Sequence, residues 1–355
     1  MKLRGLILLV MVAVLLGLAA CGNGRDEDEL PNGASRTPLD NATQNDASSQ
    51  DREFIERSDH GYIAMQHIRF MNDYLYRRPP FTYRELETAL WIVDELKAMG
   101  HEAVNIEVQQ FHVSDVSRPE TLQRMVMFGI YGGREMREYS QNVVLTIPGQ
   151  SERVIIIGAH YDTVQYVGAS DNASGVALLL ESAQRMLEMD NYYTLVYVFF
   201  GAEEIGLYGA EFFVGELSEE QRENIIFMFN ADVLFEGPYL LYMAGVNNNG
   251  FRSDNEITAI FSEVAYGLRY SHGIELITYH RGIYRWLSDH MVFFRNDIPV
   301  VCVFGLNSRG DTFDVRVLHS YRDCYHYITE RWPGKMEENM WAFSVFLEAL
   351  LMARF

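Results

Sequence analysis

Short apolar runs that end in polar or charged residues limit most strongly how this chain can fold. Residues 154–157 form one such run, and His160 and Asp162 come just after its end. A run this short and apolar throughout is typical of a strand that is buried on both faces. Such runs alternate with longer segments of helical periodicity. We therefore expect an α/β domain of three layers, with a central, mostly parallel mixed sheet and helices on both of its faces.

The expected elements cover residues 63–354. Helices are predicted at residues 63–76, 82–99, 173–189, 211–224, 256–268 and 336–354. Strands are predicted at residues 104–113, 125–131, 142–147, 154–158, 194–200, 225–229, 239–244 and 297–304. Thr82 followed by Glu85 is the pattern of an N-terminal capping box, so we expect a helix to begin there.

The first residues have the pattern of a secretion signal. Lys2 and Arg4 precede an apolar segment at residues 5–20, which is shorter than the ~20 residues that span a bilayer. The sequence Leu-Ala-Ala-Cys-Gly around Cys21 resembles the lipobox of bacterial lipoproteins, in which the cysteine becomes the lipidated first residue. We therefore expect a protein outside the cytoplasm that is anchored to a bacterial membrane by lipid on Cys21. The alternative is an ordinary secretion signal with a chance cysteine.

The chain accordingly divides into three parts, a lipoprotein signal peptide at residues 1–20, a disordered polar tether at residues 21–53 and one folded domain at residues 54–355. The tether has too few large apolar residues to offset its chain entropy by burial. In the domain, Cys302 and Cys324 could pair in an oxidising compartment. Because residues 300–304 have the pattern of a core strand, an unpaired Cys302 is favoured.

The net charge of −20 restricts the partners of the chain. An acidic protein repels the phosphates of nucleic acids, so we expect no nucleic-acid partner. The same charge suits cationic small substrates.

Two further strand-like runs end in carboxylates. One leads to Glu203 and Glu204, and the other leads to Asp232. Because the carboxyl ends of parallel strands meet at one edge of a sheet, we expect these side chains near His160. Asp171, at the start of an expected helix, would join them. Imidazole and carboxylate are suitable ligands for zinc, although each pattern alone also fits a solvated loop or a turn.

The same residues recur in the order of a known family. The matching stretches are G-A-H-Y-D-T-V, S-D-N-A-S-G-V-A, F-F-G-A-E-E-I-G-L-Y-G-A, N-A-D-V, S-D-H-M-V-F-F and H-S-Y-R-D. From about residue 139 to residue 323, the chain resembles the co-catalytic di-zinc exopeptidases. That family includes bacterial leucyl aminopeptidases, aminopeptidase Y, glutamate carboxypeptidase and glutaminyl cyclase.

The resemblance implies which residues bind the metal. His160 and Asp232 would bind one zinc ion. Glu204 and His319 would bind a second zinc ion, and Asp171 would bridge the two.

The resemblance also implies roles for three carboxylates that do not bind metal. Glu203 would be the general base, which takes a proton from the attacking water and passes it to the leaving amine. Asp162 would orient the His160 ring from behind. Asp323 would do the same for His319.

The sequence departs from the family pattern at two positions. Several family aminopeptidases place a tyrosine immediately before the last ligand histidine, where it helps to stabilise the oxyanion, whereas this chain has Leu318. Zinc alone could suffice for the oxyanion, or Tyr321 or Tyr284 could take that place. The second departure is Asp297, which stands where glycine is usual.

Residues near the expected substrate pocket leave several roles open. Ser288, Asp289 and His290 match a family motif, and Asp289 could support the site, meet a cationic substrate or cap a helix. Arg281 and Arg285 could receive a substrate carboxylate or belong to a solvated loop.

The resemblance favours a two-zinc peptidase, first of all an aminopeptidase that removes N-terminal residues from peptides. The second interpretation is a glutaminyl cyclase, which performs a single-zinc acyl transfer on the same fold. His160 and the motif at residues 172–175 favour the peptidase, because the first zinc site is then complete. The third interpretation is a non-catalytic binding lipoprotein, against which the intact Glu203 argues.

Overall fold

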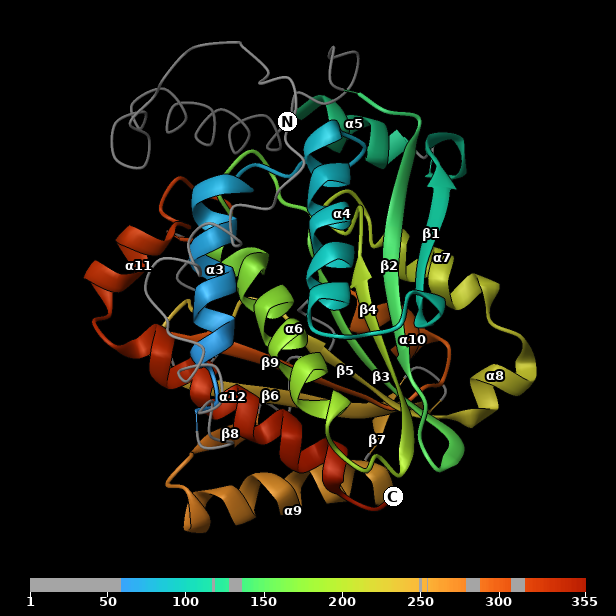
Figure 1. Cartoon of the computed structure of the whole chain (residues 1–355), viewed down its shortest axis with the longest axis vertical. Coiled ribbons are helices and arrows are strands. Elements are labelled where there is room, and N and C mark those ends of the chain that lie inside the picture. The colour runs from blue at the N-terminus through green and yellow to red at the C-terminus, as the bar shows by residue number, and fades with distance from the viewer. Residues whose placement is uncertain are drawn as a thin grey trace, which may run out of the picture. The chain divides into compact units, whose positions relative to one another are not determined.

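In the computed structural model, nine strands of the described residues form one mixed sheet (Figure 1). The strands are β1 (Ile106–His112), β2 (Tyr139–Ile147), β3 (Ser151–His160), β4 (Tyr193–Phe200), β5 (Ile225–Ala231), β6 (Tyr239–Asn248), β7 (Phe251–Ser253), β8 (Leu276–Thr278) and β9 (Val300–Leu306). They lie in the order β1-β2-β4-β3-β5-β9-β6-β7, and β8 pairs with β6.

Four parallel strands make the centre of this sheet. β4, β3, β5 and β9 lie side by side and run in one direction. The antiparallel strands β2 and β6 border them on either side. Every residue of β5 and β9 is buried. Uniformly apolar runs fold into such strands because helices cover both of their faces.

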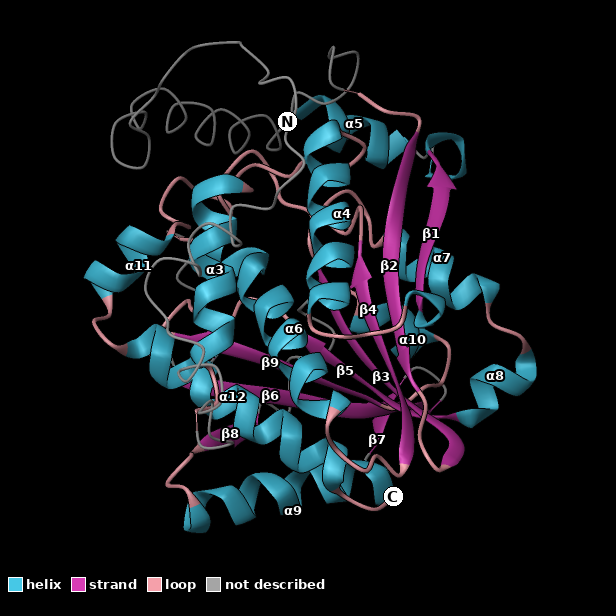
Figure 2. Ribbon diagram, in the orientation of Figure 1, coloured by secondary structure: helices cyan, strands magenta, loops and turns pink. Residues whose placement is uncertain are grey.

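The helices lie on both faces of the sheet (Figure 2). They are α3 (Tyr62–Tyr74), α4 (Tyr83–Ala98), α5 (Pro119–Met127), α6 (Ser174–Leu187), α7 (Tyr208–Glu216), α8 (Glu219–Asn224), α9 (Glu256–Ser271), α10 (His290–Arg295), α11 (Tyr325–Arg331) and α12 (Lys335–Met352). On one face, α6 packs on β3 and β5, and α3 and α12 pack against α6. On the opposite face, α7 and α10 contact each other behind the sheet. The predicted three-layer α/β fold is confirmed.

Two expected elements differ from the structure. Residues 125–127, predicted as the start of a strand, end helix α5 instead, and residues 128–131 lie outside the described residues. Met125 is buried in an apolar cluster with Phe81 and Phe111, whereas Val126 and Met127 are 61% and 66% exposed, as expected for a helix that buries one side only. The helix expected at residues 211–224 is interrupted between α7 and α8, where Ser218 and Gln221 form a capping box that starts the second helix.

The structure clarifies the expected capping box at Thr82 and the departure from the family pattern at Asp297. Thr82 caps α4 by accepting a hydrogen bond from the Glu85 amide, but the Glu85 carboxylate does not complete the box and accepts a hydrogen bond from the Phe81 amide instead. Asp297 has a φ of 62°, in the left-handed region that glycine adopts without strain. This conformation explains why glycine is usual at that position.

The structure describes residues 59–116, 119–127, 136–248, 251–253, 255–278, 288–307 and 317–355. Gly61–Phe355 forms one compact unit. The expected signal peptide, the expected lipid on Cys21 and the expected tether fall on residues outside the described ranges. Among the helices that are described, none combines the length and the apolarity needed to cross a membrane.

Candidate active site

The carboxyl edge of the parallel strands carries most of the residues predicted to bind metal. His160 is the last residue of β3, and Asp232 directly follows β5. Glu203 and Glu204 come three and four residues after Phe200, the end of β4. Because these three strands are parallel neighbours, their ends present side chains at one place.

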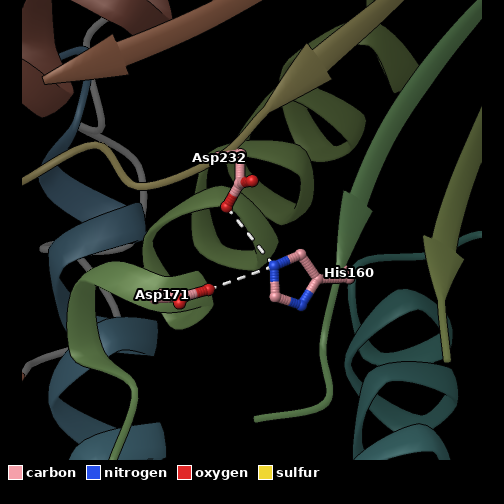
Figure 3. Close-up of side chains that lie close together, drawn as sticks. All are labelled: His160, Asp171 and Asp232. Atoms are coloured by element: carbon pink, nitrogen blue, oxygen red, sulfur yellow. Dashed lines mark hydrogen bonds and ion pairs between the residues drawn. The ribbon is translucent and has the colours of Figure 1, made fainter. Parts of the chain in front are cut away.

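Three buried side chains form the first group at this edge (Figure 3). His160 Nε2 lies 3.1 Å from Asp171 Oδ1 and 3.3 Å from Asp232 Oδ1. Asp171 reaches this position from the turn just before α6. One imidazole nitrogen and two carboxylate oxygens therefore face one another inside the protein.

A second group shares Asp171 with the first. His319 Nε2 lies 3.0 Å from Asp171 Oδ2 and 3.2 Å from Glu204 Oε2. Asp171 thus turns one carboxylate oxygen toward His160 and the other toward His319. The His319 side chain is 50% exposed, which leaves this end of the site open to solvent.

The donor atoms have a spacing that suits zinc. In each group, the possible ligand atoms lie within 4.8 Å of one another. Two ligands at about 2.0–2.2 Å from a tetrahedral zinc ion are separated by roughly 3.3–3.6 Å, close to the 3.0–3.3 Å found between donors here. One histidine and two carboxylates in each group are also ligands that zinc accepts. The residues therefore fit two cations that share Asp171.

The carboxylates give this edge a strong affinity for positive charge. The Glu204 carboxylate raises the pKa of His319 to about 12. Burial lowers the pKa of His160, but Glu203 and the three aspartates around it outweigh burial and raise that pKa well above its usual value. Burial likewise opposes ionisation of Asp171, yet the two histidines hold its pKa below the usual range. Protons and metal ions therefore compete for the same positions.

Asp162 contacts residues of both groups, His160 in the first and Glu204 in the second. Its two carboxylate oxygens accept hydrogen bonds from the Glu203 amide at 3.0 Å and from the Glu204 amide at 3.1 Å. Its carbonyl oxygen lies 3.1 Å from His160 Nδ1, whereas its carboxylate lies 3.7 Å from that nitrogen. Asp162 therefore positions the loop after β4 as well as the His160 ring.

Glu203 is a buried carboxyl with a high proton affinity. Burial raises its pKa well above the usual value, and Glu204, Asp289 and Asp232 add to the increase, while His160 opposes it. A carboxylate that binds a proton this readily is suited to general base chemistry.

Asp323 supports Asp171 and not His319, so the prediction for this residue was wrong. Its carboxylate oxygens accept hydrogen bonds from the Ser170 amide at 2.6 Å and from the Asp171 amide at 3.0 Å. The family resemblance had implied that Asp323 orients His319. Residues 317–323 form turns before α11, and the Asp323 carboxylate binds the Ser170 and Asp171 amides instead.

Sequence reasoning missed two buried charged residues that hold the site. Arg78 is fully buried and binds carbonyl oxygens of the segment that follows β3. Glu85, interpreted only as a capping residue, is also fully buried. Its Oε1 accepts hydrogen bonds from the Ser140 hydroxyl and from the Ala202 amide, immediately before Glu203. Neither residue stands in a pattern that distinguishes it from its exposed neighbours.

Asp289 lies close to the site but is closed off from solvent. It is fully buried, and neither carboxylate oxygen has a hydrogen-bond partner among the described residues. It makes no side-chain cap to α10, so the capping role was wrong. Burial raises the pKa of Asp289 well above its usual value, and Asp162 and Asp232 reinforce this effect.

The remaining candidates are settled in part. Leu318 packs against the apolar cluster around Phe304 and Val233. The guanidinium carbon of Arg322 lies over the Tyr321 ring, 5.2 Å from the ring centre. Cys302 is a buried free thiol and does not pair with Cys324. The candidates Arg281, Tyr284 and Arg285 lie outside the described residues.

A parallel sheet edge that gathers two groups of histidine and carboxylate is suited to metal-assisted hydrolysis. The chain belongs to peptidase family M28, whose family model matches residues 142–344. It is therefore a metallopeptidase of that family, and the predicted resemblance is confirmed at the level of the family.

Individual curated relatives match this chain at low sequence identity or over only part of their length. The alkaline phosphatase isozyme conversion protein of Escherichia coli (strain K12) is 27% identical over 249 residues, which are 59% of this chain and 70% of that protein. Seven further curated relatives are matched over 18–37% of their own length, and six of these are named as aminopeptidases or probable aminopeptidases.

Solved structures of two activities share the fold. The zinc aminopeptidase BSAP from Bacillus subtilis superimposes with a TM-score of 0.65 at 16% identity, over 82% of this chain and 94% of that chain. The glutaminyl cyclase of Porphyromonas gingivalis has a TM-score of 0.61 at 17% identity, over 83% of this chain and 98% of that chain. At such identities the likeness concerns the fold alone, so the choice between the two activities depends on the site.

Proposed function

We propose that this protein is a two-zinc aminopeptidase that removes N-terminal residues from peptides. The observation that supports this most directly is the orientation of Asp171, which turns Oδ1 toward His160 and Oδ2 toward His319. A carboxylate with one oxygen in each group would allow two neighbouring ions to share it. The names of several aminopeptidases among the relatives favour the same reaction.

In this proposal, each ion has its own histidine. His160 and Asp232 would hold the first ion, and His319 and Glu204 the second, with Asp171 between them. When bound, the ions would stabilise the negative charge that develops on the scissile carbonyl oxygen and acidify the attacking water.

Glu203 would carry the proton during the reaction. As a buried carboxyl with a raised pKa, it would take a proton from the attacking water and return it to the amine nitrogen that leaves. Asp162 would fix the backbone of Glu203 by its hydrogen bond to the Glu203 amide. This bond would keep the base in place while its charge changes.

Leu318 stands where the family pattern has a tyrosine, and Tyr284, one possible replacement, lies outside the described residues. Leu318 itself is partly buried against an apolar cluster and has no polar atom in its side chain. In the proposal, the positive charge of the bound ions would therefore stabilise the oxyanion without a phenol from this position.

A glutaminyl cyclase is the second candidate, since it uses one zinc ion on the same fold. The complete group of His160, Asp171 and Asp232 favours the peptidase, because a single-zinc enzyme does not need it.

We also propose that lipid on Cys21 anchors the protein outside the cytoplasm. Partition of the full chain into a detergent phase, lost in Cys21→Ser, supports the anchor, and equal partition of both forms refutes it.

The proposed reaction is tested by cleavage of a peptide library by the zinc-loaded full chain. We expect N-terminal residues to be released and about two zinc ions to be bound per chain. Glu203→Gln is expected to lower kcat by about 100–10,000-fold with zinc content unchanged, whereas Glu220→Gln on the exposed surface of α8 leaves kcat unchanged. One zinc ion per chain together with cyclisation of N-terminal glutamine would refute the aminopeptidase. Full activity of Glu203→Gln would refute the assignment of the base.

A further inference from the structure

Arg78 is a fully buried cation beneath the candidate metal site. Its guanidinium donates four hydrogen bonds, all to backbone carbonyl oxygens. Nε bonds to Tyr161 O at 2.7 Å, Nη1 to Leu75 O and Val167 O at 2.9 Å, and Nη2 to Gly168 O at 3.2 Å. In the described part of the chain, no carboxylate forms an ion pair with it. A buried charge is stable only when hydrogen bonds replace its hydration, and here the backbone supplies them.

The carbonyls that Arg78 binds belong to the segment between two metal-binding residues. Tyr161 directly follows His160, and Gly168 stands three residues before Asp171. The Arg78 backbone also pairs with Thr163 in both directions, by a hydrogen bond from its amide to Thr163 Oγ1 and one from the Thr163 amide to its carbonyl. Arg78 therefore fixes both ends of the segment that carries Asp171 to its place.

The backbone at Gly168 is too closely packed to accept a side chain. Its φ is 67°, and a Cβ at this position would collide with the Thr163 side chain and the Asp171 carbonyl oxygen and approach Arg78 Nη2 to 3.1 Å. The backbone around the guanidinium therefore has little freedom to adopt another path.

The charges around Arg78 are those of the metal site. Asp323, Asp162, Asp171 and Glu204 all act on it electrostatically. Burial lowers the pKa of Arg78 to about 10, against the opposing effect of these carboxylates, so the side chain stays charged near neutral pH. Its positive charge offsets part of the repulsion among carboxylates that must lie close together before any metal arrives.

We propose that Arg78 is a positioning residue of the metal site, which sets zinc affinity by holding the segment between His160 and Asp171 and by balancing the charge of the carboxylates. The inference rests on the proposed function, because it assumes that zinc binds at this edge. Arg78 does not contact the ions or the substrate in this role. It acts through the backbone that presents Asp171.

Zinc affinity of Arg78 variants tests the proposal. Zinc alone is titrated into the metal-free full chain against a coloured chelator, and the rise in Tm on zinc addition is measured in parallel. Loss of a residue that orients metal ligands typically lowers metal affinity by about 10–100-fold, and we expect this for Arg78→Met. Arg78→Lys, which keeps the charge but not the planar fork, is expected to lose less. The matched control is Arg77→Met, because Arg77 is the exposed neighbour of Arg78. This variant protein should bind zinc with wild-type affinity.

The outcomes separate this role from a merely structural one. If Arg78→Met lowers the Tm of the metal-free protein but binds zinc with wild-type affinity, Arg78 only stabilises the fold and the proposal is wrong. If Arg78→Met does not fold, Arg78→Lys and Arg78→Gln are judged by the same zinc titration. Failure of all three to fold would assign Arg78 to folding and also overturn the proposal. A wild type that binds no zinc would instead refute the proposed function.

Discussion

Two buried histidines of this protein have opposite acid–base properties. His67 on α3 is 4% exposed and His160 at the end of β3 is 1% exposed. The His67 ring lies against Trp91, with ring centroids 5.7 Å apart, and neither of its nitrogens has a hydrogen-bond partner among the described residues. Burial lowers the pKa of His67 to about 4, whereas the pKa of His160 is raised well above its usual value.

Burial alone therefore does not decide the acid–base behaviour of a histidine. Burial disfavours the charged imidazole at both positions. Around His160, however, Glu203, Asp162, Asp171 and Asp232 supply negative charge that outweighs it. At His67, burial is what lowers the pKa, and the ring remains a neutral core residue. The carboxylates therefore make the second region a cation site and leave the first a packing site.

The largest effect is expected from removing the shared carboxylate. Asp171→Ala takes one oxygen from each group, so it should abolish binding of both ions and reduce peptidase activity to background. His160→Ala should weaken mainly one ion, because His319 and Glu204 remain. Zinc counting on both purified variants measures the contrast, with His67→Leu as the control that keeps two ions. Equal zinc content in Asp171→Ala and His160→Ala would contradict a bridging Asp171.

An intermediate effect concerns pH and zinc. The pKa of His319 is raised to about 12 without metal, above its unfolded value of 6.5. Its proton therefore stabilises the metal-free fold fully below pH 6.5, and this stabilisation is lost as pH rises through the folded pKa. Zinc must displace that proton, so its affinity should rise by up to about tenfold per pH unit for each histidine deprotonated.

The measurement is the rise in Tm on zinc addition at pH 6, 7 and 8, compared with the Tm of the metal-free protein. We expect the increment to grow with pH while the metal-free Tm declines or stays level. Asp171→Ala serves as the control without an increment. A zinc increment that shrinks as pH rises would show that the histidines are not the groups displaced.

The smallest effect is expected at His67. Its folded pKa of about 4 lies below the unfolded value of 6.5, so the unfolded chain binds the proton more readily. Stability from the neutral ring is present above pH 6.5 and lost as pH falls toward 4. The loss between pH 7 and pH 5 is about 2 kcal/mol. In His67→Leu this part of the acid sensitivity should disappear.

Urea unfolding of metal-free protein at pH 7 and pH 5 checks this prediction. The matched control is His326→Leu, whose side chain is 82% exposed and should leave the pH dependence as in the wild type. An unchanged pH dependence in His67→Leu would mean that His67 is not buried as a neutral group.

The sequence predicted the strand ends better than it predicted what supports them. His160 and Asp232 follow uniformly apolar runs, so their place at the sheet edge could be deduced from the pattern and from the parallel topology. Arg78 lies in the segment between α3 and α4, Glu85 lies in the first turn of α4, and no periodicity marks either residue as buried. The strand expected at residues 125–131 failed for the opposite reason, because an apolar run proved to be partly exposed on α5.

Local patterns of apolar and polar residues were sufficient to predict the layered α/β fold and the kinds of side chain at its carboxyl edge. Which of these groups meet depends on contacts between distant parts of the chain. Asp323 lies 152 residues from Asp171 in the chain and yet accepts the hydrogen bond of its amide. Arg78 reaches carbonyls more than 80 residues away. Such contacts depend on how the loops close over the sheet, and no local pattern specifies that path.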